Sequence, residues 1–93
     1  MLDNSIKIFK MLSDENRLRI FHMLRERELC ACDLQEGLNL TQSGLSYHMK
    51  IMTDTGLVLK RPEGNWIHYR LNEDYSEIID LIENVVSKDL SHQ

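Results

Sequence analysis

The clearest pattern of apolar and polar positions predicts an amphipathic helix between Thr41 and Gly56. Leu45, Met49 and Met52 recur at helical spacing, Thr41 offers a hydroxyl N-cap, and Gly56 supplies a C-terminal stop. The other face carries hydrogen-bonding side chains without negative charge: Gln42, Ser43, Ser46, Tyr47 and Lys50. Such a face suits the edge of a base pair, although an ordinary solvated helix face has the same pattern.

A second helical pattern directly precedes this helix. Residues 28–40, ELCACDLQEGLNL, place Leu34 and Leu38 in helical register and lead into the Thr41 helix. Two short helices joined by a tight turn form a helix-turn-helix, whose second helix enters the major groove of DNA.

After this helix the period changes to that of strands. Residues 57–61 and 66–71 alternate and are rich in aliphatic and aromatic residues, and they flank a predicted hairpin loop at residues 62–65. A hairpin directly after a helix-turn-helix is a wing, although it could also simply be a sheet that covers one end of the core. Three polar residues are its candidates for contact with the DNA backbone or minor groove: Lys60, Arg61 and Asn65.

The two ends of the chain predict helices with more apolar surface than one domain face needs. Residues 3–12 form the first helix, and residues 72–74 begin the last one. We expect these helices to pack in a homodimer interface, although a small domain core could absorb part of their surface.

Between them, Ser13 or Asp14 is expected to cap a helix over residues 15–26. Its arginines are expected to face outward, either toward phosphates or toward solvent: Arg17, Arg19 and Arg25. His22 lies among apolar neighbours, so we expect it to be a partly buried structural histidine.

Composition bounds the remaining possibilities. The chain has 93 residues, 42% of them hydrophobic, so we expect one domain over residues 1–93. Neither a membrane-spanning run nor the order of a signal peptide is present in the sequence, so we expect a cytoplasmic protein without a membrane partner. A glycine-rich phosphate loop, an HExxH motif and a convincing triad are also missing, which argues against an enzyme.

The formal net charge of −4 does not exclude DNA, because the acidity is concentrated in the tail. Residues 72–93 carry a net charge of −5, whereas residues 41–71, which hold the predicted recognition helix and wing, carry +2. The local field around these elements is therefore positive although the whole chain is acidic.

Two cysteines separated by one residue, Cys30 and Cys32, stand at the start of the first helix of the helix-turn-helix. At this spacing they are poorly placed to bridge each other. In a reducing compartment such a pair more often indicates metal or redox chemistry than a structural disulfide.

The order of these elements resembles the ArsR/SmtB family of metal-responsive winged-helix repressors. The resemblance is carried by LSDENRLRI, ELCACDL, LTQSGLSYHMKIMTDTGLV and GNWIHYRL, and it covers nearly the whole chain. It implies a mainly α fold with a small β-hairpin, in the order α-α-α-α-β-β-α, and a homodimer through the first and last helices. It also implies binding to a two-fold symmetric operator in double-stranded DNA, and release by an inducer. On this resemblance the contacts to bases and phosphates come from Ser43, Ser46, Tyr47 and His48, with Gln42 at the helix entrance. His48 also fits a structural hydrogen bond.

The resemblance also directs attention to the cysteine pair. On an ideal helix residues i and i+2 lie about 200° apart and could not hold one ion. Because Cys30 falls near the predicted N-cap and Cys32 in the first turn, local distortion could bring both sulfurs together. Soft thiolates select soft ions, so we expect arsenite or antimonite, or else cadmium, lead or zinc, as inducer and no obligatory cofactor.

One position departs from the arsenic-sensing pattern. Some members of the family have a third cysteine where this chain has Gln35, so a third ligand must come from solvent, a small thiol or another side chain. The family's other common site, built from Asp and His on the last helix, is not expected, since that helix offers only Asp80, Glu83 and a terminal His92.

Three alternatives remain open at this point. The cysteines could be small buried hydrophobic residues in a regulator of another signal. They could sense oxidation, although a ring closed across one residue is expected to be strained. The protein could also bind DNA constitutively, without any inducer.

Overall fold

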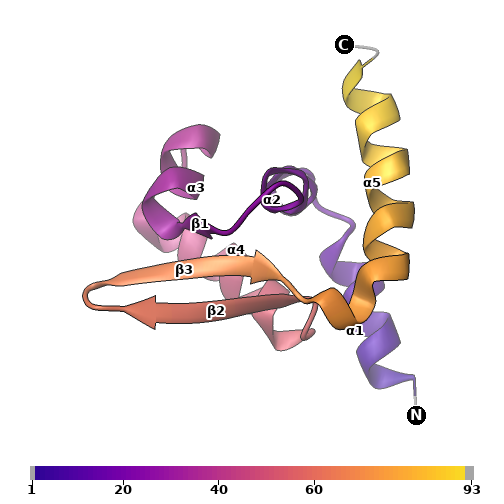
Figure 1. The fold of residues 1–93 in the computed structure, drawn as a ribbon, viewed down its shortest axis with the longest axis horizontal. Helices are drawn as coiled ribbons and strands as arrows, with labels where there is room; N and C mark the ends of the chain where they lie inside the picture. Colours follow the sequence, from indigo (N-terminus) through magenta and orange to yellow (C-terminus); the bar gives the residue numbers. More distant parts are fainter. Residues whose placement is uncertain (1, 92–93) are drawn as a thin grey trace.

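The computed structural model describes residues 2–91, which form helices and one antiparallel sheet (Figure 1). The helices are α1 (Asp3–Met11), α2 (Glu15–Leu24), α3 (Ala31–Leu38), α4 (Gln42–Asp54) and α5 (Ser76–Ser91). The strands are β1 (Leu29–Cys30), β2 (Val58–Glu63) and β3 (Trp66–Leu71), and a short 3₁₀ helix, η1 (Glu73–Tyr75), precedes α5. The predicted mainly helical winged helix-turn-helix order is confirmed.

The sheet contains one strand that the sequence pattern did not predict. Its strand order is β1-β3-β2, and β1 pairs with β3 through Leu29 opposite Tyr69 and Cys30 opposite His68. Two residues are too few to show an alternating pattern, so only the partner strand reveals β1. The wing is therefore joined by hydrogen bonds to the segment that begins α3.

The hairpin between β2 and β3 is tighter than predicted. Its strands pair as far as Glu63 opposite Trp66, so the turn contains only Gly64 and Asn65 instead of four residues. Gly64 has a φ of 62°, which favours glycine. Pro62 lies inside β2, where it is tolerated because β2 is an edge strand.

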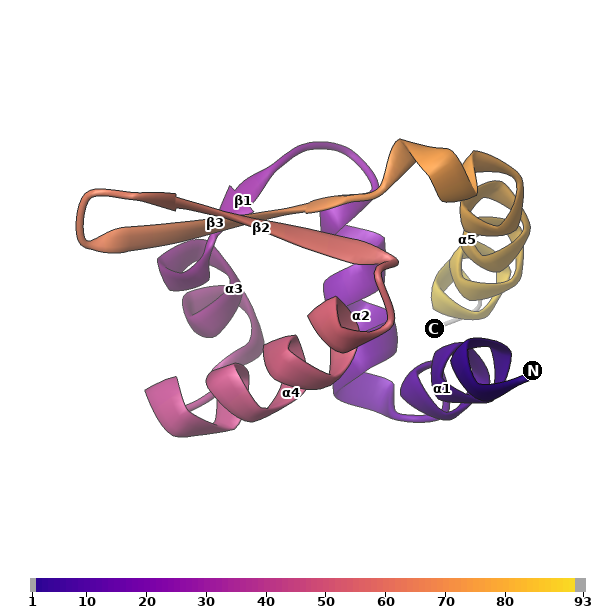
Figure 2. The ribbon, with the colours of Figure 1, turned by 90° about the horizontal axis from the view of Figure 1, so that it is seen from below.

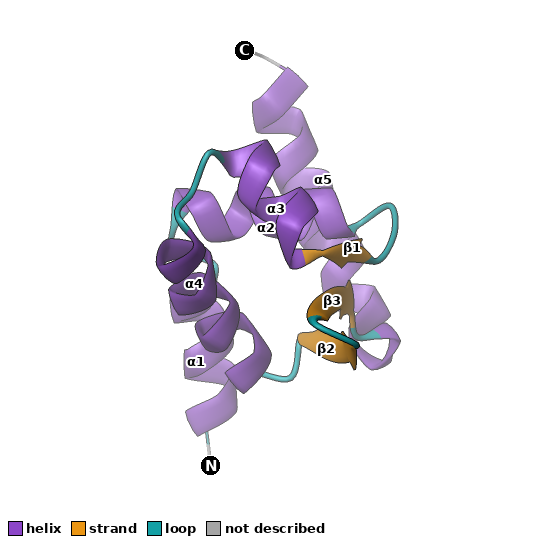
Figure 3. Ribbon diagram, turned by 90° about the vertical axis from the view of Figure 1, so that its left-hand side faces the viewer, coloured by secondary structure: helices purple, strands orange, loops and turns teal. Residues whose placement is uncertain are grey.

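The core lies between the sheet and the helices. Figures 2 and 3 show α2, α3 and α4 on one face of the sheet, while the hairpin projects beyond the helices. Side chains with less than 2% exposure fill this space: Met11, Ile20, Phe21, Leu34, Met49, Met52, Leu57 and Val58. These residues hold α4 by its apolar side, as its periodicity predicted.

α1 and α5 lie at the end of the molecule opposite the hairpin (Figure 2). Large apolar side chains on both helices are at least 48% exposed: Leu2 just before α1, Ile6 and Phe9 in α1, and Leu81 and Val85 in α5. The predicted excess of apolar surface on the first and last helices is confirmed. Within residues 2–91, each helix is too short or too polar to span a lipid bilayer.

Candidate nucleic-acid interface and cysteine site

The turn between α3 and α4 fixes the angle of the recognition helix, as we call α4. Asn39 ends α3 in the left-handed conformation, with φ at 53° and ψ at 45°. Thr41 begins the next helix, because its Oγ1 accepts a hydrogen bond from the Gly44 N–H at 3.0 Å. Only three residues separate the two helices.

The five polar side chains predicted for the outer face of α4 are all exposed: Gln42, Ser43, Ser46, Tyr47 and Lys50. Tyr47 is 64% exposed, so the domain core does not use its ring. Lys50 lies 3.6 Å from Asp54 through its Nζ, one turn further along the helix. Neutral donors and acceptors therefore dominate this face, and such groups can hydrogen-bond to base edges and phosphates.

His48 does not belong to this exposed face, and it makes the structural hydrogen bond that was its alternative role. Its residue is only 9% exposed, and its Nδ1 lies 3.1 Å from Arg17 Nη1. Arginine can only donate, so Nδ1 accepts and the ring proton is assigned to Nε2. Arg17 Nε also donates to the Met11 carbonyl at 2.8 Å, so this predicted outward arginine instead joins α1, α2 and α4.

The wing presents its candidate residues in two different ways. Asn65 at the tip and Lys60 on β2 are exposed, as predicted. Arg61 is held by carboxylates: Nε and Nη2 donate to Glu28 at 3.2 and 2.8 Å, and Nη1 donates to Glu63 at 3.2 Å. The hydrogen bond from Arg61 holds the pKa of Glu28 below its ordinary value, while Glu28 raises the pKa of Arg61.

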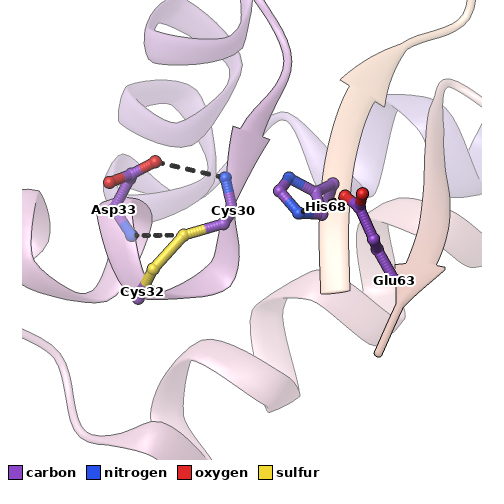
Figure 4. The surroundings of a disulfide bond; sticks show 5 residues. All are labelled: Cys30, Cys32, Asp33, Glu63 and His68. Carbon is purple, nitrogen blue, oxygen red and sulfur yellow. Dashed lines mark hydrogen bonds and ion pairs between the residues drawn. A yellow bond between two sulfur atoms is a disulfide. The ribbon is translucent and has the colours of Figure 1, made fainter. Parts of the chain in front are cut away.

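Cys30 is the N-cap of α3, and Cys32 lies in its first turn, both as predicted (Figure 4). The Cys30 Sγ accepts a hydrogen bond from the Asp33 N–H, and the Asp33 carboxylate accepts one from the Cys30 N–H, each at 3.3 Å. This reciprocal arrangement is a capping box with a sulfur in place of the usual hydroxyl. Cys30 is only 9% exposed, whereas Cys32 is open to solvent.

The two sulfurs are joined in a disulfide in this structure, which corrects the expectation that the pair is poorly placed to bridge. The expectation rested on the single residue between the two cysteines. Cys30 has extended backbone, with φ at −80° and ψ at 160°, so the chain changes direction between this residue and the first turn of α3. The two Cα atoms lie 5.3 Å apart, inside the ordinary range for disulfides.

Asp33 is a member of the site that the sequence reasoning missed. Within the described residues, one ligand atom from each of Cys30, Cys32 and Asp33 lies within 4.8 Å of the other two. The signal was available, because an acidic residue three positions after an N-cap is the capping-box pattern. Sulfur and carboxylate donors together form a set that suits a soft or borderline cation.

A cleft of about 310 Å³ brings the cysteine segment, the recognition helix and the wing tip together. Cys32 and Gln35 line it from α3, Ser46 lines it from α4, and Asn65 and Trp66 line it from the wing. Gln35 therefore faces the same cleft as Cys32, at the position where some family members have a third thiol. The proposed inducer site and the proposed DNA-binding elements are thus neighbours in space.

Two acidic residues of α5 contact α2 and the residue that ends it. His22 Nδ1 lies 2.7 Å from Glu83, and Arg25 donates to Asp80 at 2.6 Å. The structural role expected for His22 is confirmed, and Arg25 makes a contact with α5 instead of facing freely outward. His92 lies outside the described residues.

A helix-turn-helix that is followed by a paired hairpin defines the winged-helix class of DNA-binding folds. The chain belongs to the ArsR family of bacterial regulatory proteins, since the family model described as "Bacterial regulatory protein, arsR family" matches residues 14–60. The resemblance noted from the sequence is thereby confirmed.

Relatives with known names support this assignment. The arsenical resistance operon repressor of Staphylococcus aureus is 43% identical over 86 residues, which cover 92% of this chain and 81% of that protein. The repressors of the same name from Bacillus subtilis and Escherichia coli are each 46% identical over 71% and 72% of this chain. The chain spans only 64% and 58% of the length of those two proteins.

Solved structures show the same fold. HlyU from Vibrio cholerae is 31% identical, with a TM-score of 0.79 over 89% of this chain and 91% of that one. A homodimeric winged helix-turn-helix DNA-binding domain from Mycobacterium bovis is 26% identical, with a TM-score of 0.82 over 99% of this chain and 86% of that one. The three repressors and the Mycobacterium bovis DNA-binding domain are regulatory proteins, not enzymes, as we expected of this chain.

Proposed function

We propose that this protein is a transcriptional repressor that binds a two-fold symmetric operator as a homodimer and leaves it when a soft metalloid or metal ion binds Cys30 and Cys32. The observation that carries this proposal is the position of the cysteine pair. The pair stands at the first turn of α3, and α3 ends only three residues before the recognition helix begins.

The DNA-binding surface consists of the exposed face of α4 together with the wing. Ser43, Ser46 and Tyr47 contact base edges and phosphates, with Gln42 at the helix entrance and Lys50 on the same face. Asn65 and Lys60 extend the surface along the backbone or minor groove. His48 is not part of this surface, because it is buried against Arg17.

The homodimer is proposed to form through α1 and α5. Phe9, Leu81 and Val85 are each at least 60% exposed, and such apolar surface is unusual for a domain that remains a monomer. The Mycobacterium bovis relative is described as homodimeric, which supports a homodimer here. Two copies of α4 related by a two-fold axis would match a palindromic operator.

Trivalent arsenic or antimony is the inducer that we favour. Three of the named relatives are arsenical resistance operon repressors, and the Cα atoms of Cys30 and Cys32 lie 5.3 Å apart, close enough for both thiolates to bind one ion. Asp33 offers an oxygen beside the sulfurs in place of the third thiol that Gln35 does not provide. A soft divalent metal is the second candidate inducer. It is supported by a Staphylococcus aureus relative, 31% identical, that is named a cadmium resistance transcriptional regulatory protein homologue.

The inducer competes with the disulfide for the same two sulfurs. Reduction by a dithiol breaks the sulfur–sulfur bond, delivers two electrons and two protons to Cys30 and Cys32, and leaves the dithiol oxidised as a disulfide. A cytoplasmic location would keep the pair in this reduced form. The helix N-terminus then favours the thiolates that a soft ion requires.

Operator binding by the reduced protein, with and without arsenite, tests the proposal. We expect wild-type protein to lose operator affinity when arsenite is added, and the Cys30→Ser and Cys32→Ser variants to stay bound. Full operator affinity of the reduced wild type in the presence of arsenite would contradict the proposal. Variants that respond like wild type would instead exclude the cysteine pair as the inducer site.

Thiol oxidation is the second candidate signal, and the disulfide in the structure favours it specifically. Peroxide would convert the two thiols into the disulfide and be reduced to two molecules of water. Counting free thiols and measuring operator binding after peroxide, and separately after arsenite, distinguishes the two candidates. Release by peroxide alone supports the redox signal, release by arsenite alone supports the metalloid, and release by neither supports a constitutive DNA-binding protein.

A further inference from the structure

Arg61 is the most fully engaged cation of the wing. Both oxygens of Glu28 accept hydrogen bonds from its guanidinium, and Glu63 accepts a third. Two parallel N–H···O contacts between arginine and a carboxylate fix direction as well as distance. Lys60, the preceding residue, is exposed and has no ion pair within residues 2–91, so two adjacent cations of one strand are held very differently.

The contact between Glu28 and Arg61 crosses the sheet beside the cysteine pair. Glu28 directly precedes β1, Arg61 lies on β2, and β3 runs between these two strands. In the register of the sheet, Cys30 is opposite His68, and His68 is opposite Arg61. Figure 4 shows the His68 ring between Cys30 and Glu63, and the His68 Nε2 lies 3.2 Å from the Glu63 carboxylate.

This side-chain link reinforces a very short strand pairing. β1 contains only two residues, so its backbone pairing with β3 is the minimum that defines a strand. An exposed ion pair adds little free energy to folding. Its contribution is therefore one of direction, since its two parallel contacts orient Arg61 of β2 toward the residue that precedes β1.

We propose that Glu28 and Arg61 form a strap, as we call this pair, which ties the wing to the cysteine segment and makes the wing a second output of the inducer site. This proposal rests on the proposed function, in which the recognition helix is the first element that responds to the inducer. A change at Cys30 alters the start of α3 and the end of β1 together, and the strap carries the second change to β2. Arg61 is thereby a positioning residue, and Lys60 is the wing cation that remains available to phosphate.

The chain provides its own reporter for this proposal. Trp66 is the only tryptophan, it lies opposite Glu63 in the hairpin, and it is 59% exposed. Trp66 also lines the cleft that Cys32 lines, so its emission responds to the position of the wing relative to the cysteine pair, without any DNA. The experiment records Trp66 emission of the full-length protein before and after a dithiol reduces the cysteine pair, and again after arsenite is added.

The variants are Glu28→Gln and Arg61→Ala, with Lys60→Ala as the matched control. We expect wild type and Lys60→Ala to show the same change in emission, and both strap variants to lose most of it while their thiol counts follow wild type. A full change in the strap variants would overturn the proposal. So would a wild-type emission that stays constant while the thiol count changes.

Operator binding provides the second readout and separates the two proposals. Arsenite weakens operator binding by some factor in wild type, and in both strap variants this factor should be smaller by roughly 5-fold or more. In the double variant Glu28→Gln/Arg61→Ala the factor should be no smaller than in the single variants. If Arg61 were instead a phosphate contact, Arg61→Ala would reduce the salt dependence of binding as Lys60→Ala does, and Glu28→Gln would strengthen binding. A wild type that does not respond to arsenite contradicts the proposed function, whereas the emission change on reduction still tests the strap.

Discussion

Cys30 caps the helix that carries Cys32, because its Sγ accepts a hydrogen bond from the Asp33 N–H at 3.3 Å. The same sulfur is therefore part of the fold and part of the proposed inducer site. Any event that changes the bonding of this sulfur also changes the start of α3. This double role connects the chemistry of the cysteine pair to the position of the recognition helix.

Because Cys30 has both roles, the Cys30→Ser and Cys30→Ala variants should differ in folding stability, while both should lose the response to arsenite. Serine keeps an acceptor at the N-cap, so Cys30→Ser should unfold with nearly the wild-type free energy, whereas Cys30→Ala should lose about 0.5–2 kcal/mol. Urea unfolding of the reduced proteins measures this difference. Cys32→Ser, at an exposed position without a capping role, serves as the control and should stay within about 0.5 kcal/mol of wild type. Equal stability of the alanine and serine variants would show that the sulfur does not cap α3.

Arg17 is expected to stabilise the fold and not to bind DNA. Its side chain donates to the Met11 carbonyl and to His48, so Arg17→Ala leaves two partly buried acceptors unpaired and should cost about 1–3 kcal/mol. Thermal or urea unfolding provides the measurement. Arg19→Ala removes a more exposed arginine paired only with Glu15 and should change stability by less than about 0.5 kcal/mol. Equal losses in both variants would argue against the contact with His48.

Replacement of Ser43 or Tyr47 by alanine tests the recognition helix. Each variant should lose about 1–3 kcal/mol of specific operator affinity, because a base-edge contact is removed, while its dimer stays intact. Lys50→Ala should weaken binding to specific and non-specific DNA alike, and it should reduce the salt dependence of binding by about one phosphate contact. Unchanged operator affinity in both the Ser43 and Tyr47 variants would mean that another surface reads the DNA.

The dimer should depend on the apolar side chains shared by α1 and α5. The variants Phe9→Asp and Val85→Asp each place a charge in the proposed interface, so sedimentation should show a shift from dimer to monomer. Trp66→Ser removes an equally exposed aromatic residue from the wing and should leave the dimer unchanged. A dimer that survives both aspartate variants would place the interface elsewhere.

The ion pair of the strap should persist to a lower pH than the ordinary pKa of a glutamate would allow. The folded protein holds the pKa of Glu28 below its usual value of 4.5, and the side-chain hydrogen bond from Arg61 is the main cause. Its stabilising contribution is therefore complete above the unfolded value and is lost only as the pH falls through the lower folded value. Trp66 emission should change in that window for wild type but not for Glu28→Gln. An identical acid titration of both proteins would mean that the strap does not hold the wing.

The fold could be predicted from the sequence wherever apolar periodicity extends over several turns or strand residues. The Thr41 cap, the apolar side of α4 and the exposed apolar surface of α5 all follow from such patterns. β1 could not be predicted, because a strand of two residues has no period and is defined only by its partner on β3. The turn of the hairpin was placed too early, since Pro62 was expected to end β2 but is tolerated on an edge strand.

The site was predicted less completely than the fold because several of its side chains contact residues that are distant in the sequence. The roles of Arg17 and His48 depend on a contact between residues far apart in the sequence, and no local pattern reports it. Arg61 was expected to contact DNA because its charge is visible in the sequence, whereas its partner Glu28 lies 33 residues away. The disulfide was judged unfavourable from the one-residue spacing, which does not reveal that Cys30 has extended backbone.

The most direct test of the central claim follows operator release and thiolate coordination in one titration. Arsenite is added to reduced protein bound to a labelled operator, and both the anisotropy of the label and the ultraviolet absorbance of the thiolate complex are recorded. We predict that the two curves coincide and end at one arsenite per cysteine pair, and that Cys30→Ser and Cys32→Ser give neither signal. Retention of the operator after the absorbance has saturated would contradict the account.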